Sequence, residues 1–144
     1  FDYLRADGWY VADNVSLPKA FADHVAVGPA GVFVVQILWT DLEAQQGDPL
    51  ARARIASWQL RTVLQNQELA VEVVPVVLVW GPTLGQGEAA TEVVDSVLVL
   101  VGSRTHEWLP DLIGQRHLDS GTVELVRSAI AGVWPATARA TLPV

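Results

Sequence analysis

The sequence predicts a single α/β domain with a central mixed β-sheet flanked by helices. The chain has 144 residues and is 51% hydrophobic, which is enough for one sizeable core. Apolar runs typical of buried strands alternate with segments of helical periodicity. Charged residues make up only 17% of the chain. Because this is below the usual ~25%, the composition argues against disorder.

The N-terminal part is predicted to end a helix and then form three strands. The last turns of the helix are expected before Gly8, and residues 9–15 form the first strand. After a loop, residues 23–27 and 32–39 form a β-hairpin whose connection is the four-residue segment 28–31. The second arm is almost entirely apolar, as expected of a central strand that is covered on both faces.

The C-terminal part is predicted to add a long helix, two buried strands and two shorter helices. Asp48 has the residue type of an N-cap, and Pro49 suits the first helical position. Apolar residues recur at helical spacing from there to about Asn66, and Trp58 is assigned to the core among them. The remaining elements are strands at 71–80 and 93–101, a helix capped by Ser103 or Thr105, and a helix from Asp119 or Ser120 to about Val133. The domain is expected to span residues 1–134, with residues 135–144 as a tail.

Net charge and residue content restrict the function classes. The formal net charge is −7, so the domain as a whole repels phosphate, which counts against strong non-specific nucleic-acid binding. The chain has no cysteine, which excludes disulfides, thiolate nucleophiles and cysteine-ligated zinc. No apolar run has the ~20 residues that cross a bilayer, and a cytoplasmic location is expected. The lack of any methionine predicts a piece of a longer protein, whose other parts are free to carry a membrane anchor.

Several strings in the chain resemble the NERD (nuclease-related) domain. They cover most of the chain and are Gly8-Trp9-Tyr10-Val11, Asp23-His24-Val25, Gly28-Pro29, Gly31-Val32-Phe33-Val34-Val35, Asp48-Pro49, residues 74–82 and Trp108-Leu109. The resemblance implies a restriction-endonuclease-like α/β fold with an active site of the PD-(D/E)xK type. It also implies that the ancestral activity is Mg²⁺-dependent DNA cleavage.

A site of this type needs an Asp on one strand, and a Glu and a Lys two residues apart on the next. The carboxylates bind the metal ion, and the lysine, which shares the strand face of the Glu, orients a water molecule. Here Asp23 matches the Asp, but Gln36 replaces the Glu and Leu38 replaces the Lys. Losing such groups typically costs several orders of magnitude in rate. We therefore expect a degenerate, inactive domain that acts as a binding or regulatory module, without a cofactor and with Asp23 as the metal ligand if there is one.

Two alternatives remain open at this stage. Asp41 and Glu43 follow the strand closely, and Arg52 or Arg54 could replace the charge of the lysine, which would give a Mg²⁺-dependent nuclease with relocated groups. The other alternative is a structural domain that binds a protein or associates with itself. DNA is a weak candidate partner, with Arg52 and Arg54 as its contacts. Arg54 and Arg61 share a helix face, whereas Arg52 lies about 160° from Arg54.

Asp23 and Gln36 also have structural interpretations. Asp23 is equally suited to accept a hydrogen bond from a backbone N–H at a strand edge. Gln36 lies in an apolar strand and needs a hydrogen-bond partner if it is buried, and Asp23 is the expected acceptor. His24 alternates to the opposite face of the strand and is expected to have a structural role.

Overall fold

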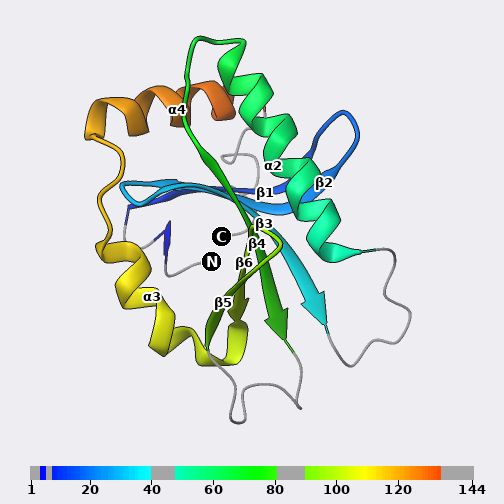
Figure 1. The fold of residues 1–144 in the computed structure, drawn as a ribbon. Coiled ribbons are helices and arrows are strands. Elements are labelled where there is room, and N and C mark those ends of the chain that lie inside the picture. Colours follow the sequence, from blue (N-terminus) through cyan, green and yellow to red (C-terminus); the bar gives the residue numbers. More distant parts are fainter. Residues whose placement is uncertain (1–3, 6–7, 40–47, 81–89, 134–144) are drawn as a thin grey trace, which may run out of the picture.

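The computed structural model describes residues 4–5, 8–39, 48–80 and 90–133 of the chain. These residues form one α/β domain with a mixed six-stranded sheet flanked by helices, which confirms the predicted fold class (Figure 1). The strands are β1 (Tyr10–Ser16), β2 (Phe21–Gly28), β3 (Gly31–Trp39), β4 (Val73–Trp80), β5 (Thr91–Val94) and β6 (Val97–Val101). The helices are α2 (Pro49–Gln65), α3 (Thr105–Gly114) and α4 (Ser120–Val133), and a 3-10 turn (Gly102–Arg104) precedes α3.

The strand order in the sheet is β1-β2-β3-β4-β6-β5. The strands β1, β2 and β3 form an antiparallel meander, whereas β3, β4 and β6 run parallel to one another. The edge strand β5 pairs antiparallel with β6. The central strand β3 therefore has a strand on either side, and its side chains enter the cores on both faces of the sheet, which explains its nearly continuous apolar sequence.

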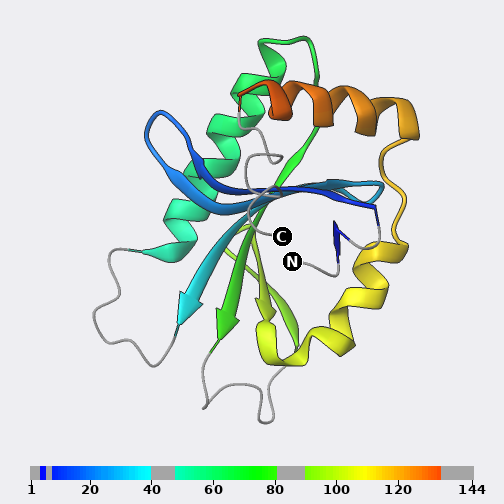
Figure 2. The same cartoon turned by 180° about the vertical axis from the view of Figure 1, so that it is seen from behind.

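Helices cover both faces of the sheet, as the two opposite views of the ribbon show (Figures 1 and 2), and each face has its own hydrophobic core. On one face α2 and α4 pack on β1 to β4, through buried residues that include Leu60, Leu64, Val126 and Ile130. On the other face α3 and the N-terminal segment cover the sheet, through Leu4, Trp9 and Trp108. No helix in the described ranges is long and apolar enough to cross a membrane.

The central hairpin forms as predicted, but its connection is shorter. The strands β2 and β3 extend to Gly28 and Gly31, which pair with each other, so that only Pro29 and Ala30 form the turn. Gly31 has φ +139°, a value that favours glycine, whereas Gly28 is not among the residues with positive φ. The expected four-residue connection is therefore wrong, because two of its residues belong to the ladder.

The predicted strand at 93–101 is a second hairpin. Asp95 and Ser96, which lie inside the predicted strand, form the turn between β5 and β6. Their φ angles are 50° and 67°, and two consecutive positive φ values are the signature of a tight type I′ hairpin turn. The polar pair thus reverses the chain, which adds one strand to the predicted order.

The helix α2 begins as the sequence predicts. The Asp48 carboxylate accepts a hydrogen bond from the Leu50 N–H at 3.0 Å, and Pro49 occupies the first turn. The assignment of Trp58 to the core is wrong, because this side chain is 58% exposed. The face that meets the sheet is made instead by Ala53, Ala56, Ser57, Gln59, Leu60 and Leu64.

Of the predicted N-terminal caps of the last two helices, one is confirmed and the other is wrong. Asp119 caps α4 as expected, because its Oδ1 accepts a hydrogen bond from the Thr122 N–H at 2.7 Å. The predicted cap of α3 by Ser103 or Thr105 is wrong. The 3-10 turn leads directly into α3, and Arg104 holds the N-cap position without a side-chain cap hydrogen bond. The expected tail at 135–144 lies outside the described residues.

Candidate functional site

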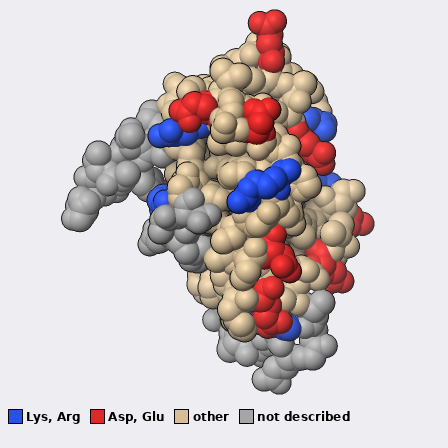
Figure 3. Space-filling view, turned by 90° about the vertical axis from the view of Figure 1, so that its left-hand side faces the viewer, with Lys and Arg blue, Asp and Glu red and all other residues tan. Residues whose placement is uncertain are grey.

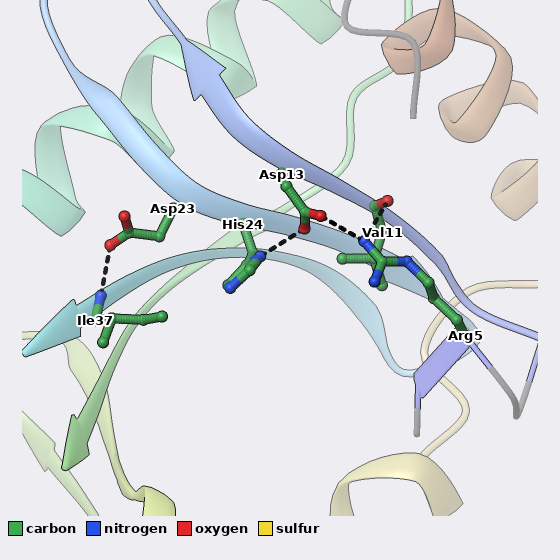
Figure 4. Close-up of polar contacts among 6 residues, drawn as sticks. All are labelled: Arg5, Val11, Asp13, Asp23, His24 and Ile37. Atoms are coloured by element: carbon green, nitrogen blue, oxygen red, sulfur yellow. Dashed lines mark hydrogen bonds and ion pairs between the residues drawn. The ribbon is translucent and has the colours of Figure 1, made fainter. Parts of the chain in front are cut away.

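The strands β2 and β3 separate at the place where the sequence predicts a site. Their ladder runs from the turn as far as the pair His24 and Val35 and does not continue beyond it. From there the Asp23 Oδ2 accepts a hydrogen bond from the backbone N–H of Ile37 at 2.7 Å (Figure 4). The Gln36 side-chain amide donates to the backbone carbonyl of Phe21. Two side chains thus satisfy backbone groups that the ladder no longer pairs.

The hydrogen bond expected between Gln36 and Asp23 is therefore replaced by two bonds to the main chain. Because the strands move apart, each side chain reaches across to the backbone of the other strand. The hydrogen bond from the Ile37 N–H agrees with the structural interpretation of Asp23, in which its carboxylate accepts a hydrogen bond from a backbone N–H. Gln36 is only 4% exposed, so its amide needs this partner.

Leu38, at the position where the NERD resemblance leads one to expect a lysine, packs against an apolar cluster. It packs against a small core formed by Ala53, Val77, Val79 and Val97. Ala53 belongs to the first half of α2, and the others belong to β4 and β6. A cluster of this composition contributes hydrophobic burial and offers no positive charge at this position.

The donor set at this place does not fit Mg²⁺, which prefers several carboxylate and water oxygens in near-octahedral geometry. Asp23 supplies one carboxylate, which is already hydrogen-bonded to Ile37, and Gln36 supplies a neutral amide oxygen. Asp41 and Glu43, the candidates for relocated ligands, lie outside the described residues. Within the ranges that the structure describes, no three His, Asp or Glu side chains form a group that could hold a metal ion.

The structure also places three charged or titratable groups together that the sequence did not connect. Asp13 on β1 pairs with His24 on β2, and the His24 Nδ1 lies 2.7 Å from Asp13 Oδ1 (Figure 4). The Arg5 guanidinium lies 2.7 Å from the other oxygen of the same carboxylate. His24 therefore has a structural partner, as expected from its alternation. The signal for this cluster is the strand register, which the sequence alone does not supply.

Burial and hydrogen bonding shift the pKa values in this cluster. Burial lowers the pKa of His24, and the hydrogen bond to Asp13 opposes this shift without cancelling it. The neutral imidazole thus donates its Nδ1–H to the carboxylate. For Asp13, burial alone would raise the pKa, but hydrogen bonds from His24 and Arg5 outweigh it, and the pKa is lowered. The carboxylate is ionised at neutral pH.

The arginines predicted to contact DNA lie on different sides of α2. Arg54 and Arg61 both line a groove of about 560 Å³ between α2 and the residues at the start of β4, together with Trp58. The Arg54 Nη1 also donates to the backbone carbonyl of Asp95 at 3.3 Å. Arg52 is not among the residues that line this groove. The predicted pair of Arg52 and Arg54 is therefore not brought together, whereas Arg54 and Arg61 are, as their seven-residue spacing indicated.

Replacing Gln36 by leucine is expected to lower the free energy of unfolding by about 1 kcal/mol, because the Phe21 carbonyl loses its donor. The apolar surface that the leucine side chain buries offsets part of the free energy lost with this hydrogen bond. Urea unfolding of both proteins measures the difference. The matched control is Gln67→Leu at an exposed position, where the change should be within about 0.5 kcal/mol. Equal effects in the two variants would contradict a structural role for the Gln36 amide.

The relation of this chain to known proteins rests on the sequence strings described above. No protein-family model, no curated protein and no solved structure matches the chain. The resemblance to the NERD domain therefore remains a prediction. The fold and the contacts of Asp23, Gln36 and Leu38 provide the basis on which a function can be proposed.

Proposed function

We propose that the chain is a degenerate nuclease-related domain that is catalytically inactive and serves as a binding or regulatory module of a longer protein. One observation carries the proposal. The two polar side chains at the expected nuclease position, Asp23 and Gln36, both bind backbone groups where β2 and β3 separate. The side chains at these positions would bind a metal ion in an active nuclease, whereas here they stabilise the fold through hydrogen bonds to the backbone.

Three features of this place work against phosphodiester cleavage. Using Asp23 as a metal ligand would compete with its hydrogen bond to the Ile37 N–H. The amide of Gln36 is neutral and offsets none of the charge of a divalent ion. Leu38 offers no cation to orient water or to stabilise the phosphate in the transition state.

The arrangement of the strands supports the relation to the nuclease fold. The mixed sheet places the hairpin β2–β3 next to the parallel strand β4, and the residues of the expected site lie on this hairpin. This is the kind of α/β core that the NERD resemblance implies. A cytoplasmic location belongs to the same proposal, because a chain without cysteine is suited to a reducing compartment.

The proposal predicts that the domain does not cleave plasmid or single-stranded DNA in the presence of Mg²⁺ or Mn²⁺. The measurement is gel analysis of DNA after incubation with the purified domain and with its Asp23→Ala variant. We expect the two proteins to be indistinguishable from buffer, because the site lacks two of the three required groups. Cleavage by the original domain that disappears in Asp23→Ala would overturn the proposal.

The same assay addresses the relocated nuclease. Cleavage that persists in Asp23→Ala but disappears in a double variant, Asp41→Ala with Glu43→Ala, would favour an enzyme with relocated ligands. Cleavage that persists in all variants would indicate a contaminating nuclease, and repeating the assay after further purification would remove it.

A further inference from the structure

The side of α2 that faces the start of β4 carries a row of four side chains that have no role in the proposed function. Arg54, Trp58, Arg61 and Gln65 follow one another at spacings of four, three and four residues, so they lie on one stripe of the helix. All four line the groove described above, which we call the α2 groove. Its opposite wall comes from the residues that lead into β4 and from its start, including Val71 and Val73.

The α2 groove combines an exposed aromatic ring with positive charge. Trp58 exposes more than half of its surface, although a tryptophan side chain gains several kcal/mol when it is buried. Arg61 makes no hydrogen bond or ion pair with another residue that the structure describes. Glu72 is the acidic residue among those that line the groove. In a chain of net charge −7, this stripe is a local site of positive charge with an apolar centre.

We propose that the α2 groove binds an acidic peptide segment of a partner protein. The segment has two carboxylates, one on each side of an apolar residue. The guanidinium groups of Arg54 and Arg61 would bind the carboxylates, and Trp58 would contact the apolar residue between them. Arginine and carboxylate groups form strong paired hydrogen bonds because their planar geometries match. Tryptophan and arginine are also the residue types that most often dominate the energy of protein interfaces.

The spacing of the arginines defines the spacing of the carboxylates. Seven residues of an α-helix rise about 10.5 Å. In a polyproline II segment, residues three apart point to the same side and are about 9.3 Å apart. An acidic residue followed by two others and a second acidic residue therefore matches the distance between Arg54 and Arg61. The groove thus selects the pattern acid-x-x-acid, with an apolar residue or proline at x.

A nucleic acid fits the same groove less well. A strand carries a phosphate at every nucleotide, whereas this stripe offers two guanidinium groups and Glu72 lines the other wall. On the face that carries α3 and α4, acidic and basic side chains are both scattered over the described surface (Figure 3). Charge complementarity therefore favours a short acidic peptide over a continuous polyphosphate.

The test uses an array of fluorescein-labelled 12-residue peptides that contain Asp-x-x-Asp or Glu-x-x-Glu, with Leu, Val, Phe or Pro at x. Each peptide has a matched control in which the acids are replaced by Asn or Gln. Fluorescence anisotropy with the whole chain measures the dissociation constant. We expect acidic peptides to bind about tenfold more tightly than their amide controls, since each control loses two charge-assisted contacts.

Variants of the chain locate the binding. Arg61→Glu and Trp58→Ala should each weaken the binding of the best peptide about tenfold or more. The matched control is Arg52→Glu, which makes the same charge change on the same helix but outside the groove, and should leave the affinity within about twofold. Circular dichroism verifies the fold of each variant, and both substituted groove residues are exposed.

Three outcomes would overturn the inference. They are an array in which no acidic peptide exceeds its amide control, binding that survives Arg61→Glu, and a single-stranded oligonucleotide that displaces the peptide or binds more tightly than it. The inference rests on the proposed role as a binding module, but the two fail in different experiments. DNA cleavage that depends on Asp23 would refute the inactive site and leave the peptide result intact.

Discussion

Replacing Gly28 by alanine should lower the free energy of unfolding by about 3 kcal/mol. A Cβ atom at this position would lie 2.3 Å from two ring atoms of Trp9, closer than any real contact allows. The Trp9 ring cannot move away easily, because it is buried and stacks on Phe33 with ring centroids 5.8 Å apart. The cost arises from space and not from backbone strain, since Gly28 does not have a positive φ. Urea unfolding monitored by circular dichroism measures the change.

Gly132→Ala is the control for this variant, because it adds the same methyl group where nothing lies within 4 Å. Gly132 belongs to α4, where alanine is the better helix former, so stability should rise by about 0.5 kcal/mol. Opposite signs for the two variants are the expected result. A Gly28→Ala protein as stable as the original would show that Trp9 does not pack against the β2–β3 hairpin in solution.

Local signals in the sequence were sufficient for most elements of this fold. Asp48 and Pro49 specify the start of α2 by a side-chain hydrogen bond and a fixed φ, both of which act within one turn. The apolar sequence of β3 identifies it as a central strand, because a strand in the middle of a sheet that is covered on both faces buries the side chains of both faces. These features depend on residues close in the chain.

The orientation of α2 was not predictable in the same way. The helix has two stripes with apolar residues, one with Ala53, Ala56 and Leu60 and the other with Ile55 and Trp58. Periodicity favours the stripe with the larger side chains. The sheet instead selects the alanines, because small side chains let the helix axis come close to the strands. That choice depends on the surface of the sheet, which is built from distant parts of the chain.

In the candidate site, too, some features follow from nearby residues and others depend on distant parts of the chain. The sequence placed Asp23 and Gln36 on neighbouring strands, and the structure agrees. Their partners, the Ile37 N–H and the Phe21 carbonyl, follow from the separation of β2 and β3 beyond His24. A separation of strands depends on sheet twist and packing, which no spacing of residues encodes directly.

The second large effect concerns the charged cluster of Arg5, Asp13 and His24, which lies on the other face of β2. Asp13→Ala should lower the free energy of unfolding by about 2 kcal/mol at neutral pH, because His24 and Arg5 both lose a 2.7 Å hydrogen bond to the carboxylate. The Arg5 side chain is 33% exposed, so water compensates part of its loss, whereas His24 is more buried. Asp111→Ala on the exposed side of α3 is the control and should change stability by less than about 0.5 kcal/mol.

The cost of Asp13→Ala should increase as the pH falls from about 7.5 to about 5. Burial lowers the pKa of His24 in the folded protein, so its contribution to stability is complete above the unfolded value of about 6.5 and is lost as the pH falls towards the folded value. Asp13 raises the pKa of His24 and limits this loss, so without the carboxylate the protein should lose more stability over the same range. In the background of His24→Gln, the cost of Asp13→Ala should no longer depend on pH in this window. A cost that stays constant with His24 present would mean that the imidazole does not sense the carboxylate, and that the cluster is held by Arg5 alone.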